Sequence, residues 1–198
     1  MDNFEHKSVV LIGFMGCGKS CVARALAAHL NRDAVDIDTL IEQAAGKPIP
    51  EIFGERGEEE FRRLETEQLR AALEYSGAPR IIATGGGIVT REENRKLLQA
   101  AAKRGLLVVY LRASSDVLAR RIRQQPGQRP LIDGGKILNM QQTRERVTEL
   151  LAERAPLYES VANLIVETGK PAPAVVAQEI EQALSAQSVS RPPVTATI

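Results

Sequence analysis

The sequence predicts an α/β protein in which a parallel β-sheet lies between two layers of helices. Short runs of β-branched and other apolar residues alternate with segments of helical period along most of the 198 residues. The first of these runs leads directly into a glycine-rich segment, GFMGCGKS at residues 13–20, which opens a helical pattern. Such alternation is typical of three-layer folds built from successive β-α-β units.

Five strands and six helices follow from this pattern, taken in chain order. Each expected strand is a short apolar run bounded by polar or turn residues: SVVLI at 8–12, AVDI at 34–37, RIIAT at 80–84, LLVVYL at 106–111 and ANLIV at 162–166. The longer segments with apolar residues at helical spacing predict helices at residues 18–30, 57–75, 91–104, 114–123, 138–153 and 173–186. In the third of these helices, Thr90 and Glu93 have the spacing of a capping box, and Gly105 follows the last turn.

Composition and charge narrow the class of protein. A chain with 43% hydrophobic residues and this length is expected to form one domain, over residues 1–186, followed by a mobile tail at 187–198 that contains two prolines. The 26 basic and 25 acidic side chains give no overall field that would attract nucleic acid or a membrane. There is no secretory signal pattern or membrane span, so we expect a cytoplasmic location. No exposed apolar stripe calls for a subunit partner, so we expect a monomer.

The segment GFMGCGKS has the G-x-x-x-x-G-K-[ST] spacing of a phosphate-binding loop between a strand and a helix. Its glycines let backbone N–H groups point inward at a phosphate, and the helix N-terminus adds its positive dipole end. Lys19 is then placed to reach the outer phosphates, and Ser20 offers an oxygen to Mg²⁺. The plain alternative is a flexible turn with an exposed lysine.

Two further segments lie at expected strand ends. In AVDID, alternation along an extended chain would place Asp36 and Asp38 on one side, where one carboxylate can serve a metal and the other a hydroxyl. The alternative is that both are solvated, or that Asp38 caps a helix beginning at Thr39. The glycines of TGGG, residues 84–87, form either a tight turn or a wall where backbone N–H groups approach a small ligand.

Six stretches together resemble the shikimate kinases, a group of nucleoside monophosphate kinase-like P-loop proteins. They are GFMGCGKS, DID at 36–38, FRRLE at 61–65, IIATGGG at 81–87, QRPLI at 128–132 and RAPLYESVA at 154–162. The resemblance implies a P-loop kinase fold with strand order 2-3-1-4-5. It also implies ATP as donor, Mg²⁺ as cofactor, and phosphorylation of the 3-hydroxyl of shikimate in the chorismate pathway to aromatic amino acids.

The resemblance also implies site residues. Asp38 would meet the ring hydroxyls as the candidate base, within a shikimate-binding segment at about 38–75. Catalysis would involve Lys19, Asp38 and Arg129, the last on a lid at about 124–136, while Asp36 would hold Mg²⁺ through water beside Ser20. The implied ATP-binding residues are Gly16, Cys17, Gly18, Lys19, Ser20, Cys21, Arg121, Arg129 and Lys170. The implied shikimate-binding residues are Asp38, Arg62, Gly85, Gly86, Gly87 and Arg154.

Several alternatives stay open at this stage. The run RRIR leaves the adenine-side arginine as either Arg120 or Arg121. At helical spacing, Arg62 can also be a surface arginine paired with Glu58 or Glu65. The rival functions are a related gluconate-type kinase and a nucleotide-binding regulatory module without catalysis.

Overall fold

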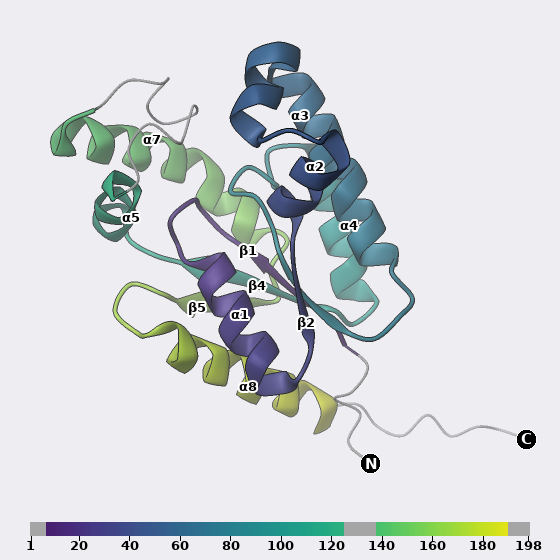
Figure 1. Ribbon diagram of the computed structural model, residues 1–198. Helices are drawn as coiled ribbons and strands as arrows, with labels where there is room; N and C mark the ends of the chain where they lie inside the picture. Colours follow the sequence, from purple (N-terminus) through teal and green to yellow (C-terminus); the bar gives the residue numbers. More distant parts are fainter. Residues whose placement is uncertain (1–6, 125–137, 190–198) are drawn as a thin grey trace, which may run out of the picture.

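Five parallel strands form the centre of the molecule in the computed structural model, which describes residues 7–124 and 138–189 (Figure 1). They lie in the order β2-β3-β1-β4-β5. The predicted α/β class is confirmed, and so is the strand order that the resemblance implied. The strands are β1 (Val9–Ile12), β2 (Asp33–Asp36), β3 (Arg80–Ala83), β4 (Leu107–Arg112) and β5 (Leu164–Glu167).

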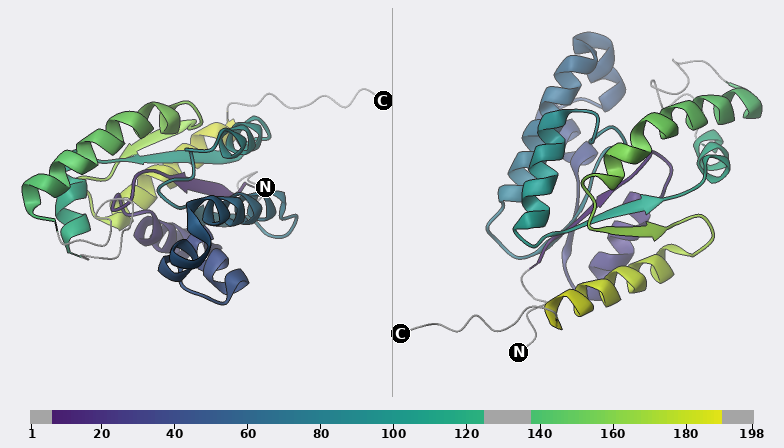
Figure 2. Two further views of the ribbon diagram at one scale, coloured as in Figure 1. Left: turned by 90° about the horizontal axis from the view of Figure 1, so that it is seen from above. Right: turned by 180° about the vertical axis from the view of Figure 1, so that it is seen from behind.

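Helices cover both faces of this sheet. Helices α1 and α8 pack against each other on one face, and α4 and α7 lie on the other (Figures 1 and 2). No helix in the described ranges is long and apolar enough to cross a membrane. The helices are α1 (Lys19–Leu30), α2 (Ile37–Ala45), α3 (Ile49–Glu74), α4 (Glu92–Lys103), α5 (Ser115–Arg123), α7 (Met140–Glu159) and α8 (Pro173–Val189).

The burial of each strand follows its place in the sheet. All four residues of β1 and five of the six residues of β4 are buried, whereas the edge strands β2 and β5 are largely exposed or half-buried. A central strand of a parallel sheet is covered on both faces, which explains why β1 and β4 are continuous apolar runs. The core therefore fixes β1, the strand that carries the glycine-rich loop.

Parallel register brings the carboxyl ends of three strands together. Val9 of β1 pairs with Ile81 of β3, and Asp36 of β2 pairs with Ala83 of β3. The segments that follow these strands must then emerge at one edge of the sheet. They are the glycine-rich loop after β1, the DID segment after β2, and the triple glycine after β3.

The largest departure from the sequence prediction lies between β2 and β3. Helix α2 was expected only in the alternative of a helix beginning at Thr39, and α3 begins at Ile49, well before the predicted start at residue 57. Pro48 is the N-cap of α3, and Pro50 stands in its first turn, a helix-start signal that the prediction overlooked. The predicted start coincides with a break, because Gly57 has non-helical angles of φ 77 and ψ 175 inside α3.

Two helix ends also differ from their predictions. Arg91, not Thr90, is the N-cap of α4, and the Thr90 hydroxyl donates to the carbonyl of Gly87, so the predicted capping box is wrong. Helix α7 runs through Pro156 to Glu159, six residues past its predicted end at 153. Helix α8 extends to Val189, beyond the predicted start of the tail, and residues 190–198 lie outside the described residues.

Candidate active site

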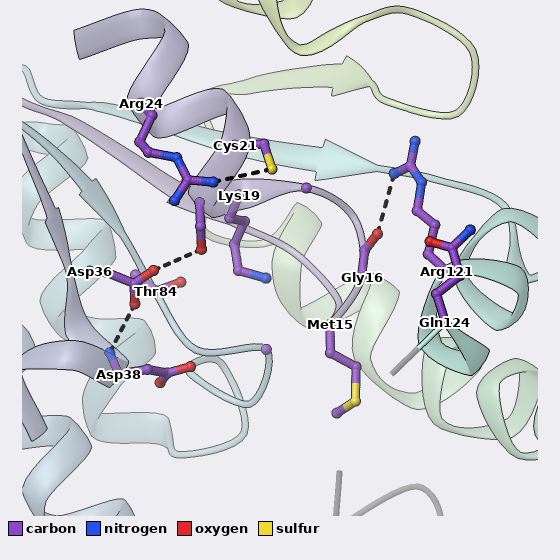
Figure 3. Close-up of a pocket in the computed structure, with 13 residues that line it drawn as sticks. Met15, Gly16, Lys19, Cys21, Arg24, Asp36, Asp38, Thr84, Arg121 and Gln124 are labelled. Atoms are coloured by element: carbon purple, nitrogen blue, oxygen red, sulfur yellow. Dashed lines mark hydrogen bonds between the residues drawn. The ribbon is translucent and has the colours of Figure 1, made fainter. Parts of the chain in front are cut away.

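The glycine-rich loop turns from β1 into α1 at the edge of the cleft shown in Figure 3. Gly18 is the N-cap of α1 with φ 105, and Gly16 has φ 81. Both angles lie in the left-handed region, which strains residues with a Cβ atom. These glycines therefore allow the backbone to wrap closely, as a phosphate-binding loop requires.

Lys19 points back over this loop. Its ammonium group donates to the carbonyl oxygens of Gly13 at 2.7 Å and Phe14 at 3.1 Å, and its side chain lines the cleft. Lys19 is 8% exposed, so the alternative of an exposed lysine on a flexible turn is wrong. A positive charge is thus held at the place where the loop would receive phosphates.

Ser20 connects α1 with the end of β2. Its hydroxyl donates to Asp36 Oδ2 at 2.8 Å, and Asp36 Oδ1 accepts the backbone N–H of Asp38 at 3.1 Å (Figure 3). Strand β2 ends at Asp36, which is the N-cap of α2. The expected extended alternation is wrong, because Asp38 lies in the first turn of α2. The capping role considered for Asp38 belongs to Asp36.

Asp38 has an unusual electrostatic environment. Burial is the largest cause that raises the pKa of its carboxyl group from 3.8 to about 6, and the carboxylates of Asp36 and Glu65 add to this effect. The cations of Lys19 and Arg62 act in the opposite direction and lower the pKa. Asp38 Oδ1 is enclosed and has no hydrogen-bond partner among the described residues. The carboxyl group can therefore accept a hydrogen bond, and its affinity for a proton is raised.

The triple glycine after β3 is tightly surrounded by the protein itself. A Cβ atom on Gly85 would lie 2.6 Å from Glu65 Oε1, and one on Gly87 would lie 2.4 Å from the Arg62 guanidinium. A Cβ atom on Gly86 would lie 2.8 Å from the backbone nitrogen of Met15. These glycines let the loop pass between α3 and the phosphate loop, so the segment is more than a simple turn.

Arg62 projects from α3 into this region. Its Nη1 donates to Glu65 Oε2 at 2.7 Å, while Nε and Nη2 both donate to Glu58 Oε1, at 3.3 and 3.2 Å. Burial alone would lower the pKa of Arg62, but the carboxylates of Glu65 and Glu58 outweigh it and raise the pKa. The ion pairs of the alternative reading exist, but Arg62 is 5% exposed and is not a surface residue.

Arg154 and Tyr158 approach the same loop from α7. Arg154 Nη1 lies 3.5 Å from the carbonyl oxygen of Gly86, and the Tyr158 hydroxyl donates to that oxygen. The Arg154 guanidinium also lies over the ring of Phe14, 5.7 Å from its centroid. Both residues are buried. Because α7 continues through Pro156, one helix carries both side chains to Gly86.

Arg121 links the phosphate loop with the segment after β5. Its Nη1 donates to the carbonyls of Gly16 and Cys17, each at 3.2 Å, and its Nη2 donates to the Thr168 carbonyl at 2.8 Å. Arg120 is exposed, and its Nε donates to the backbone carbonyl of Asp116. Of the two arginines left open by the sequence, Arg121 is therefore the one that lies at the cleft.

A cleft of about 480 Å³ unites many of these groups. Six of the predicted site residues that the structure describes do not line this cleft: Cys17, Arg62, Gly85, Gly87, Arg154 and Lys170. The side chains of Cys17, Arg62 and Arg154 are buried, and Lys170 is exposed on the loop after β5. Arg129 and nearly all of the predicted lid lie outside the described residues. The predicted residues that line the cleft are Gly16, Gly18, Lys19, Ser20, Cys21, Asp36, Asp38, Gly86 and Arg121.

The sequence interpretation missed several residues of this region. Met15, Arg24, Thr84 and Gln124 also line the cleft. Met15 and Thr84 lie inside the quoted motifs, so their positions were available as a signal. Arg24 lies on the first turns of α1, and no sequence feature distinguishes it from a surface arginine.

Relatives of known activity match nearly the whole chain. A sequence model of the family described as shikimate kinase matches residues 15–185. The chain belongs to the shikimate kinase family. A shikimate kinase of Thermodesulfovibrio yellowstonii is 41% identical over 174 residues, which is 88% of this chain and 92% of that protein. The shikimate kinase of Nitrosospira multiformis is 41% identical over 187 residues, 94% of this chain and 89% of that protein.

Solved structures of shikimate kinases share the fold. The enzyme from Acinetobacter baumannii, in complex with shikimate, has a TM-score of 0.82 at 33% identity, covering 93% of this chain and 96% of that chain. The enzyme from Aquifex aeolicus has a TM-score of 0.73 at 29% identity, over 93% of this chain and 99% of that chain. A gluconokinase from Sinorhizobium meliloti, 18% identical with a TM-score of 0.50, shows a likeness of fold alone.

Proposed function

We propose that this chain transfers the γ-phosphoryl group of ATP to the 3-hydroxyl of shikimate, giving shikimate 3-phosphate and ADP. Membership of the shikimate kinase family supports this activity. The observation that carries the proposal for the site is that Lys19, on the phosphate loop, and Asp38, on α2, line one cleft. A phosphoryl donor and an acceptor hydroxyl can therefore meet between them.

The donor side consists of the phosphate loop, Lys19 and Arg121. Backbone N–H groups at the start of α1 bind the phosphates, and Lys19 exchanges its bonds to the Gly13 and Phe14 carbonyls for bonds to phosphate oxygens. Arg121 joins this loop to Thr168, in the segment before Lys170 that we assign to the adenine side. The positive charge is thus in place before the reaction begins, as electrostatic stabilisation requires.

Ser20 and Asp36 fit the proposed Mg²⁺ ion. They supply a hydroxyl and a carboxylate 2.8 Å apart, which are the hard oxygen donors that Mg²⁺ prefers. The described residues contain no cluster of three or more His, Cys, Asp or Glu that would form an all-protein cage. That suits Mg²⁺, which commonly takes one or two protein oxygens and completes its shell with phosphates and water. When bound, Mg²⁺ neutralises charge on the β- and γ-phosphate oxygens.

The acceptor side is formed by Asp38, the triple glycine, Arg62 and Arg154. The forked guanidinium donors of arginine suit a carboxylate such as that of shikimate. Arg62 lies beside Gly87 and Arg154 beside Gly86, and both act on the buried Glu65, whose pKa they lower against the larger raising effect of burial. We assign the shikimate carboxylate to these arginines and the ring hydroxyls to Asp38.

The chemical step needs little covalent work from the protein. The acceptor oxygen forms a bond to the γ-phosphorus while the bond from that phosphorus to the ADP oxygen breaks, and the hydroxyl proton passes to the Asp38 carboxylate. A raised pKa near 6 makes this carboxylate a better proton acceptor than an ordinary aspartate, while it is still mostly ionised at neutral pH. Asp38 also orients the hydroxyl for in-line attack.

Product analysis tests this proposal. Purified protein, Mg²⁺ and ATP are incubated with shikimate, and the product is examined by mass spectrometry and by phosphorus-proton correlation NMR. We expect the mass of one added phosphoryl group and coupling of the phosphorus to the proton on carbon 3. A phosphorylated product from gluconate, with none from shikimate, would favour the rival kinase. No transfer to either compound would favour the regulatory module.

The remaining proposals concern assembly and location. We propose one P-loop kinase domain and a monomer, because the large exposed apolar side chains among the described residues are scattered over separate elements. These are Tyr75, Met140, Ile165 and Val175. Light scattering coupled to size-exclusion chromatography would show a single species near the chain mass of 21.6 kDa. The cytoplasmic location stays a prediction.

A further inference from the structure

Three N–H groups of the Arg62 guanidinium donate to carboxylates of its own helix. One end, Nη1, donates to Glu65, and the opposite edge, formed by Nε and Nη2, donates to Glu58. A substrate carboxylate binds arginine best through two parallel N–H donors on one edge. A carboxylate that binds the edge formed by Nε and Nη2 must therefore displace Glu58.

The two glutamates hold Arg62 very differently. The Glu65 side chain is 0% exposed and its contact with Nη1 is 2.7 Å. The Glu58 side chain is 53% exposed, and a single oxygen is shared by Nε and Nη2 at 3.3 and 3.2 Å. Glu58 therefore has the longer, shared contacts, and its carboxylate regains water when it leaves. Glu65 would have to leave as a buried charge.

The backbone around Glu58 also permits its departure. Gly57, the residue before it, breaks the helical conformation of α3, so Glu58 begins the second part of that helix. No atom lies within 4 Å of the position of a Cβ on Gly57, so the space beside this residue is open. The Glu58 side chain is itself half-exposed, so it can turn from Arg62 into the surrounding water.

We propose that Glu58 occupies the acceptor-binding edge of Arg62 in the empty enzyme and competes with the acceptor carboxylate for it. The inference rests on the proposed function, in which Arg62 binds the carboxylate of shikimate. Glu58 keeps a buried guanidinium paired while the site is empty, and an incoming carboxylate replaces it with no net change in the charge around Arg62. The affinity for the acceptor is then set partly by the strength of the Glu58 contact.

Substitution of Glu58 by Gln tests this competition, because Gln keeps the size and removes the charge. Glu60→Gln is the matched control, since Glu60 lies in the same part of α3 and pairs with the exposed Arg63. Binding of shikimate and of its uncharged methyl ester would be measured by isothermal titration calorimetry without nucleotide. A half-exposed ion pair contributes little, so we expect Glu58→Gln to lower the Kd for shikimate by up to about five-fold.

The ester separates competition from a general change in the pocket. Because the ester lacks the carboxylate charge, its affinity should rise less than that of shikimate, and Glu60→Gln should leave both affinities unchanged. Unchanged or weaker shikimate binding by Glu58→Gln, or an equal gain for both ligands, would overturn the inference while leaving the proposed function intact. If the wild-type protein bound no shikimate at all, the proposed function would fail, and this inference with it.

Discussion

Asp38 is the residue to which we assign the transfer of the hydroxyl proton. It lines the cleft beside the phosphate loop, and its carboxyl group lies in the field of two carboxylates and two cations. Asp36 fixes its position by accepting the Asp38 backbone N–H as the cap of α2. The same short segment thus provides a candidate metal-side carboxylate and a candidate base.

The first prediction concerns the role of Asp38 in turnover. Asn has nearly the same shape as Asp but cannot accept the hydroxyl proton at neutral pH. We expect Asp38→Asn to lower kcat by about 10²- to 10⁴-fold, the usual contribution of a general base. The Kd for ATP should stay within about two-fold, since Asp38 lies on the acceptor side. Steady-state kinetics and nucleotide titration would check both values, and normal turnover would remove Asp38 from the chemistry.

The second prediction is that the same substitution stabilises the protein. The folded-state pKa of about 6 exceeds the reference value of 3.8, so the folded state binds the proton more tightly than the unfolded state. The ionised carboxylate therefore lowers the free energy of unfolding above pH 6, and this penalty fades as the pH falls through 6 toward 4. In ligand-free protein with a chelator present, Asp38→Asn should be more stable at pH 7.5 by on the order of 2 kcal/mol.

Thermal unfolding at two pH values would check the sign of this effect. The gap in Tm between Asp38→Asn and the wild type should narrow to about half between pH 7.5 and pH 5. A gap that widens at pH 5, or a variant less stable than the wild type at pH 7.5, would show that the Asp38 carboxyl does not have a raised pKa.

At the scale of single residues, the sequence predicted the identity of the candidate site residues better than it predicted their burial and their partners. The strand-end pattern led to Asp38 and the resemblance led to Arg62, and both side chains are buried beside other charged groups. The partners of Arg62 were seen only as an alternative that would place it on the surface. Helical spacing predicts that Glu58 and Glu65 are near Arg62, but it does not reveal that α3 buries one of these glutamates and leaves the other half-exposed.

At the scale of elements, the triple-glycine loop contacts two regions of the proposed site, the phosphate loop and helix α3. Gly86 closely approaches the backbone of the phosphate loop at Met15, while Gly87 approaches the tip of Arg62. A methyl group at Gly86 must move backbone, which is costly, whereas one at Gly87 must move the end of a long side chain. The two glycines therefore offer a matched pair of substitutions.

The third prediction separates the two sides of this loop. We expect Gly87→Ala to raise the KM for shikimate several-fold and to leave the KM for ATP unchanged, because it displaces Arg62. Gly86→Ala should lower the Tm more than Gly87→Ala does, and it should weaken the binding of both substrates. Kinetics and thermal unfolding of the pair would test this, and an ATP-specific defect in Gly87→Ala would be inconsistent with the assigned arrangement.

The fourth prediction concerns α5 and uses its two adjacent arginines. Arg121→Ala removes the bonds that join the phosphate loop to Thr168, so we expect the Kd for ATP to rise by about ten-fold or more, the effect of losing charge-assisted hydrogen bonds. Arg120→Ala is the control, since Arg120 bonds to the Asp116 carbonyl and should leave the Kd within two-fold. Calorimetric titration with ATP would measure the Kd of both variants. An equal loss of ATP affinity in the two variants would contradict the assignment of Arg121, and not Arg120, to the ATP side.

The elements themselves were predictable where a single pattern dominated. All five strands were expected within two residues of their observed limits at each end. Short runs of β-branched residues favour buried strands over other structures. Helix α2 entered only as the alternative of a helix beginning at Thr39, although Ile37, Leu40 and Ile41 have helical spacing. The first part of α3 was missed because it contains prolines and glycines. Pro156 would end most helices, yet α7 continues through it, with Tyr158 packed in the core beyond.

For the whole molecule, the parallel sheet explains why distant segments form one site. The phosphate loop, the DID segment and the triple glycine are separated by up to about 70 residues but follow three adjacent strands in register. The strand pattern predicted that these segments emerge at one edge of the sheet, and the strand order that the resemblance implied made the three strands neighbours. For α7, only the resemblance pointed to Arg154, because Arg154 and Tyr158 reach Gly86 through helix packing, which the strand pattern does not reveal.

The most direct test of the central claim measures ADP release by the purified protein with Mg²⁺ and ATP, with shikimate, with gluconate and with no acceptor. The account predicts rapid release with shikimate and only slow background release in the other two reactions. Rapid release with gluconate, or no release with shikimate from a protein that still binds ATP, would contradict it. In that case the phosphate loop would be assigned correctly, and the acceptor site of Asp38, Arg62 and Arg154 would be wrong.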